Sequence, residues 1–366
     1  MKSITATALA FMFLVASAFA QEFANIEYLC CDWGPAMTWS GKTNEPPKFS
    51  DAEEEIYFLK QVGRFTRKNR LVPDLLSGSK TEDIGRGISI YLCKMKADGS
   101  EKTEIKELWH NPNHPIDTQG ASTWMDINEK TRKIALSILF AGTDVTGLWT
   151  VNLDGSDLKQ IIRPEWSQEK LVGIDHPSWT RDGQRIVFEE RMRGMHPEQF
   201  NMAICDVNGG NLKRLFDATE KIEYRQPSVS PDGEQIAFSR YFNGYPGGRQ
   251  VWLTNIDGSD AHAIPNPNDK RNTHGGDYPT WSPDGKSVFG ISMGIVDAVN
   301  GRTLLEHRPM LQGRQGTCGW PHWGKSGFVG CTIGGILFTD LGLQEAKWIG
   351  SSKLAECTGA KDSCRW

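Results

Sequence analysis

The stretch HPSWTRDGQRIVFEE, which runs from His176 to Glu190, decides the fold because the chain repeats it. Two further copies are nearly as clear: QPSVSPDGEQIAFSR begins at Gln226, and YPTWSPDGKSVFGIS begins at Tyr278. Three weaker copies begin at Pro46, Ala121 and Trp320. A phrase that returns every few tens of residues is typical of stacked supersecondary units.

Each copy has an aromatic residue or a valine at the same place, and successive anchors lie 75, 55, 50, 52 and 42 residues apart. The anchors are Phe49, Trp124, Trp179, Val229, Trp281 and Trp323. Each copy also reads as a hairpin, because a turn such as Arg181-Asp182-Gly183 separates a short strand from an apolar, β-branched strand. A second turn, such as Asp154-Gly155, adds two more strands to most units.

We therefore predict an all-β fold, a six-bladed β-propeller of four-stranded antiparallel blades. A β-sandwich also alternates strands and turns, but it gives no reason for repeating one phrase. Seven blades are the alternative, because residues 21–46 can begin an incomplete seventh blade or add a strand to the last blade.

The first twenty residues have the pattern of a secretory signal peptide, with Lys2, an apolar run from Ala8 to Phe19, and small residues around a cleavage site after Ala20. We expect cleavage before Gln21, export to the periplasm or the medium, and no membrane span in the mature chain. The expected domains are an N-terminal segment at 21–46, the propeller at 47–350 and a tail at 351–366.

Eight cysteines in an exported chain favour disulfides. The repeat places Cys318 and Cys331 at the meeting ends of two neighbouring strands, so we predict a bridge between them. Cys357 and Cys364 lie close together in the tail and form the second predicted bridge. The remaining cysteines are Cys30 and Cys31, which clamp the N-terminal segment or form a vicinal bridge, and Cys93 and Cys205, which are not expected to join each other.

The strand order of a blade predicts two different faces. The tight Asp-Gly turns lie on one face, and four long connections lie on the other, at 63–87, 189–201, 239–250 and 266–279. Because loops on a rigid scaffold carry most binding residues, we expect a ligand on the long-loop face. The formal net charge of −4 excludes a nucleic-acid partner, whereas the arginines of these loops favour an anionic glycan or a protein partner.

The residues beside each repeated proline should surround the central channel on this face. The expected ligand-binding residues are Asp175, His176, Arg225, Gln226, Tyr241, Asp277, Tyr278 and Trp320. Three imidazoles and an amide from different blades can also hold a divalent metal, and the candidate ligands are His176, Gln226, His274 and His322.

The phrase of proline, any residue, tryptophan and Ser-Pro-Asp-Gly, followed by an apolar run, resembles the repeat of the TolB-type β-propeller family. The resemblance is best at Pro279–Phe289 and Pro227–Phe238, and it extends over residues 47–350. The wider group includes oligogalacturonate lyase, which implies β-elimination across a uronate with a metal held by histidines and a glutamine. TolB itself has an α/β domain before its propeller, which the 26 residues at 21–46 are too few to form.

Two functions remain open from the sequence. The first is an exported propeller that binds a saccharide, a peptide or a partner protein without chemistry. The second is a polysaccharide lyase acting on an acidic glycan, which needs a cation for the carboxylate, a base and an acid. The candidate catalytic residues are His176, His274, Tyr241, Tyr278, Arg225 and Arg240.

Overall fold

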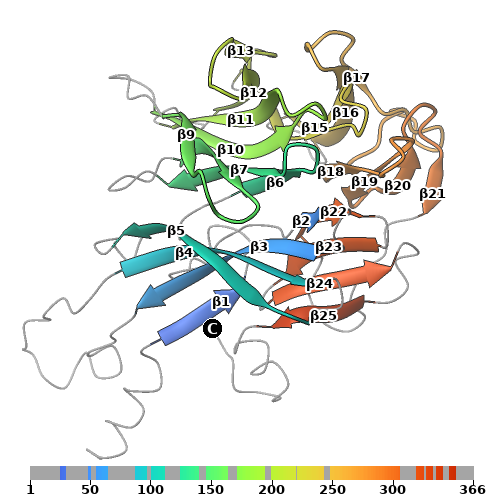
Figure 1. Cartoon of the computed structure of the whole chain (residues 1–366). Helices are drawn as coiled ribbons and strands as arrows, with labels where there is room; N and C mark the ends of the chain where they lie inside the picture. Colours follow the sequence, from blue (N-terminus) through green and yellow to red (C-terminus); the bar gives the residue numbers. More distant parts are fainter. Residues whose placement is uncertain are drawn as a thin grey trace, which may run out of the picture.

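The computed structural model describes residues 25–29, 48–50, 55–64, 87–96, 100–111, 124–139, 146–163, 171–193, 199–219, 221–242, 248–305, 319–324, 327–332, 335–340 and 346–351. All regular structure in these residues is β-strand, arranged as antiparallel sheets (Figure 1). Within the same ranges, no helix has the length and apolar character that crossing a membrane requires.

Five sheets contain four strands each, in chain order. The second sheet comprises β6 (Trp124–Asn128), β7 (Lys133–Leu139), β8 (Thr146–Asn152) and β9 (Lys159–Ile162). The third comprises β10 (Leu171–Trp179), β11 (Arg185–Arg193), β12 (Gln199–Asp206) and β13 (Lys213–Arg214). The fourth comprises β14 (Ile222–Val229), β15 (Gln235–Phe242), β16 (Arg249–Asn255) and β17 (His262–Ala263). The fifth comprises β18 (Asp277–Trp281), β19 (Ser287–Ile291), β20 (Gly294–Asp297) and β21 (Thr303–Leu305). The sixth comprises β22 (Gly319–Trp323), β23 (Gly327–Thr332), β24 (Gly335–Asp340) and β25 (Ala346–Ser351).

The first sheet has five strands, β1 (Asn25–Leu29), β2 (Lys48–Ser50), β3 (Glu55–Arg64), β4 (Gly87–Lys96) and β5 (Thr103–Asn111). Both β1 and β2 pair with the same edge of the long strand β3, β2 near its beginning and β1 near its end. Of residues 21–46, the structure describes Asn25–Leu29, and this strand joins the first sheet and not the last one.

The repeated Ser/Thr-x-Asp-Gly phrase forms one hydrogen-bonded turn in three sheets. In the third sheet the hydroxyl of Thr180 donates to Asp182 (2.6 Å), and the same carboxylate accepts from the amide of Gln184 (3.0 Å). The Thr180 hydroxyl also accepts from the amide of Arg185 (3.0 Å). Identical networks surround Asp232 and Asp284. In each turn the hydroxyl donor lowers the pKa of the aspartate, so the charged carboxylate holds the turn.

The repeated tryptophan joins the third and the fifth sheet to the sheet before it. The indole nitrogen of Trp179 donates to the carbonyl of Asp126 (3.2 Å), and that of Trp281 donates to the carbonyl of Ser228 (3.0 Å). Both tryptophans are also buried. The anchor of the phrase is therefore an inter-sheet contact, which explains why its spacing equals the spacing of the sheets.

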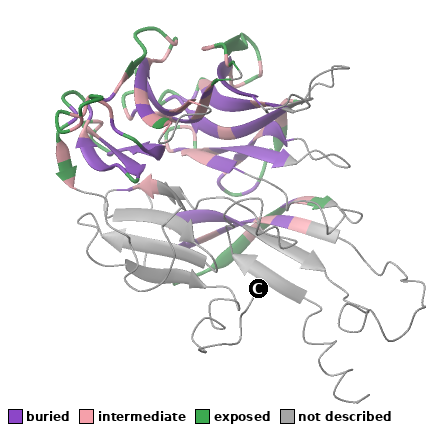
Figure 2. Ribbon diagram, turned by 180° about the vertical axis from the view of Figure 1, so that it is seen from behind, coloured by how far each residue is buried: buried purple, intermediate pink, exposed green. Residues whose placement is uncertain are grey.

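The core consists of apolar layers between neighbouring sheets rather than one central cluster. Between the second and third sheets, for example, Leu148 packs with Ile174, Trp179 and Phe188. Figure 2 shows buried residues along the strands and exposed residues in the turns. The innermost strands β6, β10, β14, β18 and β22 contact one another in order, and β2 contacts both β6 and β22. This all-β arrangement of sheets around a common centre is a β-propeller fold.

The long connections are shorter than the sequence predicts. The strand β11 continues to Arg193 and β15 continues to Phe242, so Arg191, Arg240 and Tyr241 lie in strands. Their polarity suggested loops, but they pack against neighbouring strands and are half-buried. The cysteines Cys93 and Cys205 are buried and unbridged, in β4 and β12. Gly319 pairs with Cys331, whereas residues 1–20, Cys318 and the tail with Cys357 and Cys364 lie outside the described residues.

Candidate functional site

Three innermost strands share an unusual backbone feature beside the repeated proline. His176, Gln226 and Tyr278 each precede a proline and have φ angles of 49°, 57° and 51°. The strand register shifts at each of them. Left-handed backbone in residues other than glycine costs about 1–3 kcal/mol and persists only where the surroundings enforce it. Each bulge re-aims the side chain of its strand toward the common centre.

Hydrogen bonds link the three bulges from one sheet to the next. The amide of Gln226 donates to Glu189 Oε2 (2.9 Å), and the amide of Tyr278 donates to Gln226 Oε1 (3.1 Å). Gln226 Nε2 donates to the hydroxyl of Tyr241 (3.2 Å). Gln226 is only 4% exposed, so it connects the third, fourth and fifth sheets from a buried position.

Charged side chains pair around these bulges. Glu189 Oε2 lies 3.3 Å from His176 Nδ1, and Asp175 Oδ2 lies 3.3 Å from Arg191 Nε. Glu223 Oε2 lies 2.7 Å from Arg225 Nε, and Arg249 pairs with Asp277. All four carboxylates are buried. We call these residues, together with Gln226, Tyr241, Tyr278 and Trp124, the inner-strand cluster.

Two members of the cluster have perturbed acidities. Burial raises the pKa of Glu189, but the positive charges of His176 and Arg225 and the amide of Gln226 outweigh burial, so the pKa lies below its ordinary value. Burial and the adjacent Asp277 carboxylate raise the pKa of the Tyr241 phenol. Glu189 is therefore ionised and Tyr241 is protonated at neutral pH.

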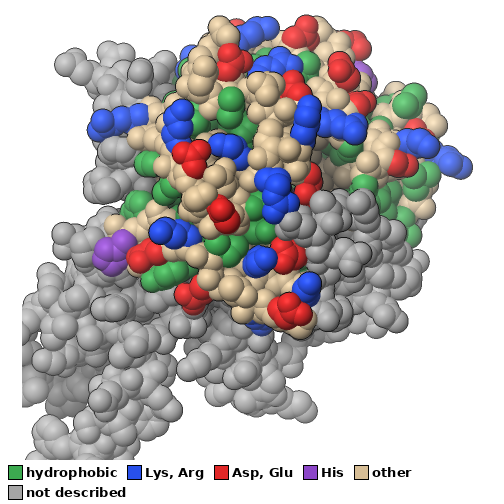
Figure 3. All heavy atoms as spheres, in the orientation of Figure 1, with side chains coloured by type: hydrophobic (Ala, Val, Ile, Leu, Met, Phe, Trp, Pro, Cys, Tyr) green, Lys and Arg blue, Asp and Glu red, His purple; other side chains and the backbone are tan. Residues whose placement is uncertain are grey.

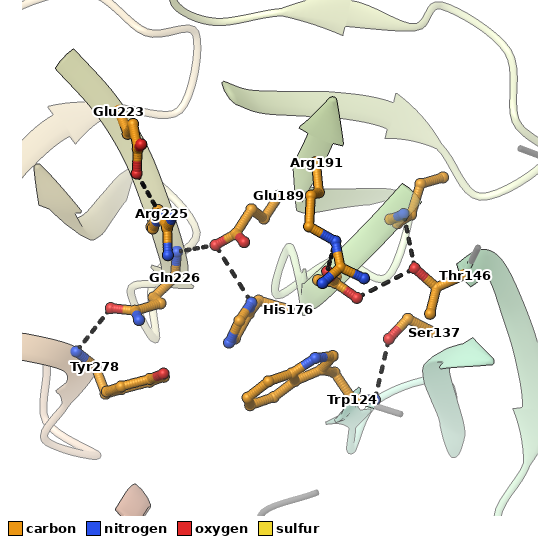
Figure 4. Close-up of polar contacts among 12 residues, drawn as sticks. Trp124, Ser137, Thr146, His176, Glu189, Arg191, Glu223, Arg225, Gln226 and Tyr278 are labelled. Atoms are coloured by element: carbon orange, nitrogen blue, oxygen red, sulfur yellow. Dashed lines mark hydrogen bonds and ion pairs between the residues drawn. The ribbon is translucent and has the colours of Figure 1, made fainter. Parts of the chain in front are cut away.

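Aromatic rings from three sheets meet at the centre of the cluster. The ring centroids of Trp124 and His176 are 3.6 Å apart, and those of His176 and Tyr278 are 5.9 Å apart. Tyr278 also stacks toward Trp124, with centroids 6.5 Å apart and planes 20° apart. Figure 4 shows the three rings facing one another below the hydrogen-bonded bulges. On the upper side, Arg225 lies 3.3 Å over the Phe200 ring and 4.8 Å over the Tyr241 ring.

Buried polar atoms without a hydrogen bond concentrate in this region of the described chain. They include His176 Nε2, Arg191 Nη2, Ser239 Oγ and Asp277 Oδ1. The nitrogens His176 Nδ1, Arg191 Nε and Arg225 Nε each lie within ion-pair distance of a carboxylate, but their geometry does not meet the criteria for a hydrogen bond. Buried polar groups are almost always hydrogen-bonded in folded proteins, so these exceptions call for an explanation.

The structure places most of the predicted binding residues together. Asp175 and His176 lie in β10, Arg225 and Gln226 in β14, Tyr241 in β15, and Asp277 and Tyr278 in β18. Trp320 and His322 lie in β22. Arg240 lies apart, with its guanidinium 4.2 Å over the Trp252 ring and 4.8 Å over the Phe242 ring.

The predicted metal ligands do not converge. His274 is buried outside the inner strands, where its Nε2 contacts the carbonyl of Gly301 at 2.7 Å. The amide of Gln226 is engaged at both its oxygen and its nitrogen. No group of three or more His, Cys, Asp or Glu side chains within the described ranges can hold a metal ion. The expectation that His176, His274 and His322 gather around a metal is therefore wrong for the described residues.

The sequence analysis missed Trp124, Glu189 and Glu223 as parts of the site. Glu189 lies directly opposite Asp175 in the hairpin register, and counting outward from the Asp182-Gly183 turn would have found it. The sequence identified Trp124 only as the anchor position of a repeat, since its contacts with the rings of His176 and Tyr278 join sheets that are far apart in the sequence.

One further motif has the wrong context for its usual chemistry. Gly290-Ile291-Ser292-Met293-Gly294 matches the G-x-S-x-G pattern of serine hydrolases. Ser292 is exposed with a φ of 70°, but it lies in the tight turn between β19 and β20. The hydrolase motif requires a strand, a sharp turn and a helix, so this serine does not form that nucleophile.

The visible outer face shows no field of a single sign. In Figure 3, acidic and basic side chains alternate over the described part of the surface. This pattern agrees with the small formal net charge of −4. Charge is therefore organised mainly as local pairs, both outside and within the inner-strand cluster.

Comparisons with known proteins support the fold. No protein-family profile matches the chain. An uncharacterised protein of Agrobacterium fabrum (strain C58), Atu1656, is 30% identical over 100 residues, which are 26% of this chain and 32% of that protein. The chain thus matches about a third of this relative's length.

Two solved structures illustrate the likeness. The oligogalacturonate lyase of Vibrio parahaemolyticus is 13% identical, with a TM-score of 0.50, over 88% of this chain and 78% of that chain. TolB of Acinetobacter baumannii is 11% identical, with a TM-score of 0.39, over 91% of this chain and 67% of that chain. At these identities the likeness concerns the fold alone, and the class is that of an antiparallel β-propeller.

Proposed function

We propose that this protein is a six-bladed β-propeller that binds a saccharide at the inner-strand cluster. The closed order of contacts, in which β2 touches both β6 and β22, supports six blades around one axis. The observation that carries the function is the concentration of unpaired, buried polar atoms beside three aromatic rings. Ligand sites combine apolar ring faces with a few placed polar groups in this way.

A saccharide fits this combination better than the other predicted ligands. A sugar ring has apolar faces that lie on aromatic rings and hydroxyl groups that donate and accept hydrogen bonds. A protein partner needs a contact of about 800 Å² on each side, and the unpaired atoms here lie below the surface within one cluster. A peptide bound by strand addition would pair with the backbone of a sheet edge, whereas the unpaired atoms here belong to side chains.

The test of binding is calorimetric titration of the protein with a panel of soluble oligosaccharides. We expect at least one to bind with heat that saturates at one site. Substituting Arg191→Gln should weaken binding by ~10-fold or more, because a hydrogen bond to a charged group contributes about 1.5–3 kcal/mol. The matched control is Arg271→Gln, which removes the same charge from an exposed connection and should leave binding unchanged. The absence of binding to every oligosaccharide would reject the proposal.

The competing function is a lyase that eliminates across a uronate. It is supported by the fold shared with oligogalacturonate lyase and by the imidazole of His176 and the phenol of Tyr278, which have the chemistry of a base and an acid. Elimination creates an unsaturated sugar that absorbs ultraviolet light. We expect no absorbance from pectic, alginate-like or ulvan-like polymers; its appearance, and its loss in His176→Ala, would establish the lyase instead.

Export is part of the proposal. Lys2, the apolar run from Ala8 to Phe19 and the small residues before Gln21 support removal of residues 1–20 by a signal peptidase. The mature protein would then meet glycans in the periplasm or the medium. N-terminal sequencing of the exported protein should begin at Gln21, and a chain that stays in the cytosol with Met1 in place would contradict export.

A further inference from the structure

The charge balance of the inner-strand cluster gives information about the charge of its ligand. Each guanidinium of the cluster already has a carboxylate beside it: Arg191 has Asp175, Arg225 has Glu223, and Arg249 has Asp277. The imidazole of His176 has Glu189. Four acidic groups therefore face three arginines and one histidine, so the cluster carries no excess positive charge.

The packing of these cations makes them poor partners for another anion. Arg225 is enclosed between the rings of Phe200 and Tyr241 as well as held by Glu223. Asp175, the partner of Arg191, also accepts a hydrogen bond from the hydroxyl of Thr146 (3.1 Å) and is 3% exposed. A ligand carboxylate would have to displace a buried acid from its cation and leave that acid unpaired, which is strongly unfavourable.

The cation without a carboxylate partner in this region is Arg240, among the described residues. Its guanidinium lies among the rings of Tyr224, Phe242 and Trp252, none of which belongs to the inner-strand cluster. Arg240 therefore does not supply the cluster with a free positive charge.

The buried polar atoms of the cluster that lack a hydrogen bond include both donors and an acceptor. His176 Nε2 and Arg191 Nη2 are buried without a hydrogen bond, and so is the acceptor Asp277 Oδ1. Figure 4 shows the imidazole of His176 beside the Trp124 indole. A hydroxyl group can both donate and accept, so a neutral sugar satisfies donors and acceptors alike, whereas a carboxylate only accepts.

We propose that the ligand is an uncharged saccharide, selected over its uronate counterpart by this cancelled charge. The inference rests on the proposed saccharide site and narrows it to one chemical class. A uronate is disfavoured because its carboxylate would lie near the buried acids Asp175, Glu189 and Asp277. Among the described residues of the cluster, no cation without a carboxylate partner lies near enough to offset this repulsion.

The experiment compares hexasaccharide pairs that differ only by oxidation at C6: a glucan with its glucuronan, a galactan with its galacturonan, and a mannan with its mannuronan. Each is titrated calorimetrically into the full-length protein in the same buffer. We expect the neutral member of at least one pair to bind at least ~10-fold more tightly than the acidic member. Arg191→Gln should weaken binding of the neutral sugar by ~10-fold or more, and Arg271→Gln should change neither its affinity nor the preference.

A measurement on the unsubstituted protein keeps the test independent of any variant's folding. Binding of the neutral sugar should be the same in 0.05 M and 0.5 M sodium chloride, because salt screens only charged partners. Tighter or equal binding of a uronate, weakened by salt, would overturn the inference while leaving the saccharide site intact. Binding of no member of any pair would overturn both.

Discussion

At the scale of single residues, Glu189 and Gln226 hold the site together. Glu189 contacts His176 of its own sheet and accepts the amide of Gln226 from the next sheet. Gln226 uses its amide, its oxygen and its nitrogen on three different partners. Two buried side chains thus fix the direction of His176 and Tyr278, the ring-bearing residues of the cluster.

The lowered pKa of Glu189 predicts an acid-dependent contribution to stability. A carboxylate whose pKa is lower in the folded state contributes stability above its unfolded pKa, about 4.3, and loses it as the pH falls through the folded value. Relative to Glu189→Gln, the wild type should therefore lose unfolding free energy as the pH falls from about 5 to 3. Urea denaturation at successive pH values measures this difference, and a constant or growing difference in acid would contradict the assignment.

Removing the side chain of Gln226 should destabilise the protein. The substitution Gln226→Leu removes the side-chain acceptor of the half-buried Tyr278 amide, which costs about 1–3 kcal/mol. The control Gln184→Leu removes an exposed amide at a turn and should change the unfolding free energy by less than ~0.5 kcal/mol. Urea denaturation of both variants decides the matter, and equal effects would show that the connecting role of Gln226 is unimportant.

At the scale of elements, the hairpin turns explain the sequence repeat. Their Ser/Thr and Asp side chains hydrogen-bond the turn backbone, and the following glycine has positive φ. The turn after β20 differs because Gly301 also approaches the connection before β18: a Cβ atom there would lie 1.6 Å from the carbonyl oxygen of Pro265. Backbone, rather than a flexible side chain, occupies that space.

Alanine substitutions at two glycines with nearly equal φ angles distinguish the cost of a positive φ from the cost of a steric clash. Gly301 and Gly285 have φ angles of 68° and 70°, and a Cβ at Gly285 would meet only Pro231 at 3.6 Å. Both alanine variants lose about 1 kcal/mol to the positive φ. Gly301→Ala should lose at least ~2 kcal/mol more, because the packed backbone must shift. Thermal unfolding compares them, and similar melting temperatures would contradict the close approach.

The elements also show what the sequence could reveal and what it could not. The phrase predicted the innermost strands correctly, because its turn and its anchor tryptophan are local signals. It misplaced Arg191 and Tyr241 in loops, since their partners Asp175 and Gln226 come from neighbouring strands. It assigned His274 to the site because the loop is polar. In the structure, the imidazole of His274 instead contacts the carbonyl of Gly301, 27 residues away in the sequence.

At the scale of the whole molecule, separate apolar layers bind the sheets into one body, and the polar cluster lies where the innermost strands meet. Neither the pairing of β1 with the first sheet nor the cancellation of charge within the cluster could be predicted from spacing. Both depend on which residues meet after the sheets have packed.

The reactivity of Cys93 and Cys205 measures how tightly the sheets are packed around them. Burial and the adjacent Asp206 raise the pKa of the Cys205 thiol to about 12, so this thiol is protonated and inert at neutral pH. We expect Cys93 and Cys205 to resist iodoacetamide at pH 8 in the native protein and to react in urea. Peptide mapping by mass spectrometry reads out both states, and it also tests the predicted bridges Cys318–Cys331 and Cys357–Cys364. Rapid native labelling of Cys205 would contradict its burial.

We propose that three sheets build one saccharide site from His176, Arg191, Tyr278 and Trp124. A crystal structure of the protein with its tightest-binding neutral hexasaccharide would locate this site. We expect a sugar ring against the rings of Trp124 and Tyr278, with hydroxyl groups hydrogen-bonded to His176 Nε2 and Arg191 Nη2. A sugar bound on the face of the Asp-Gly turns, or at the outer strands, would show that the site lies elsewhere.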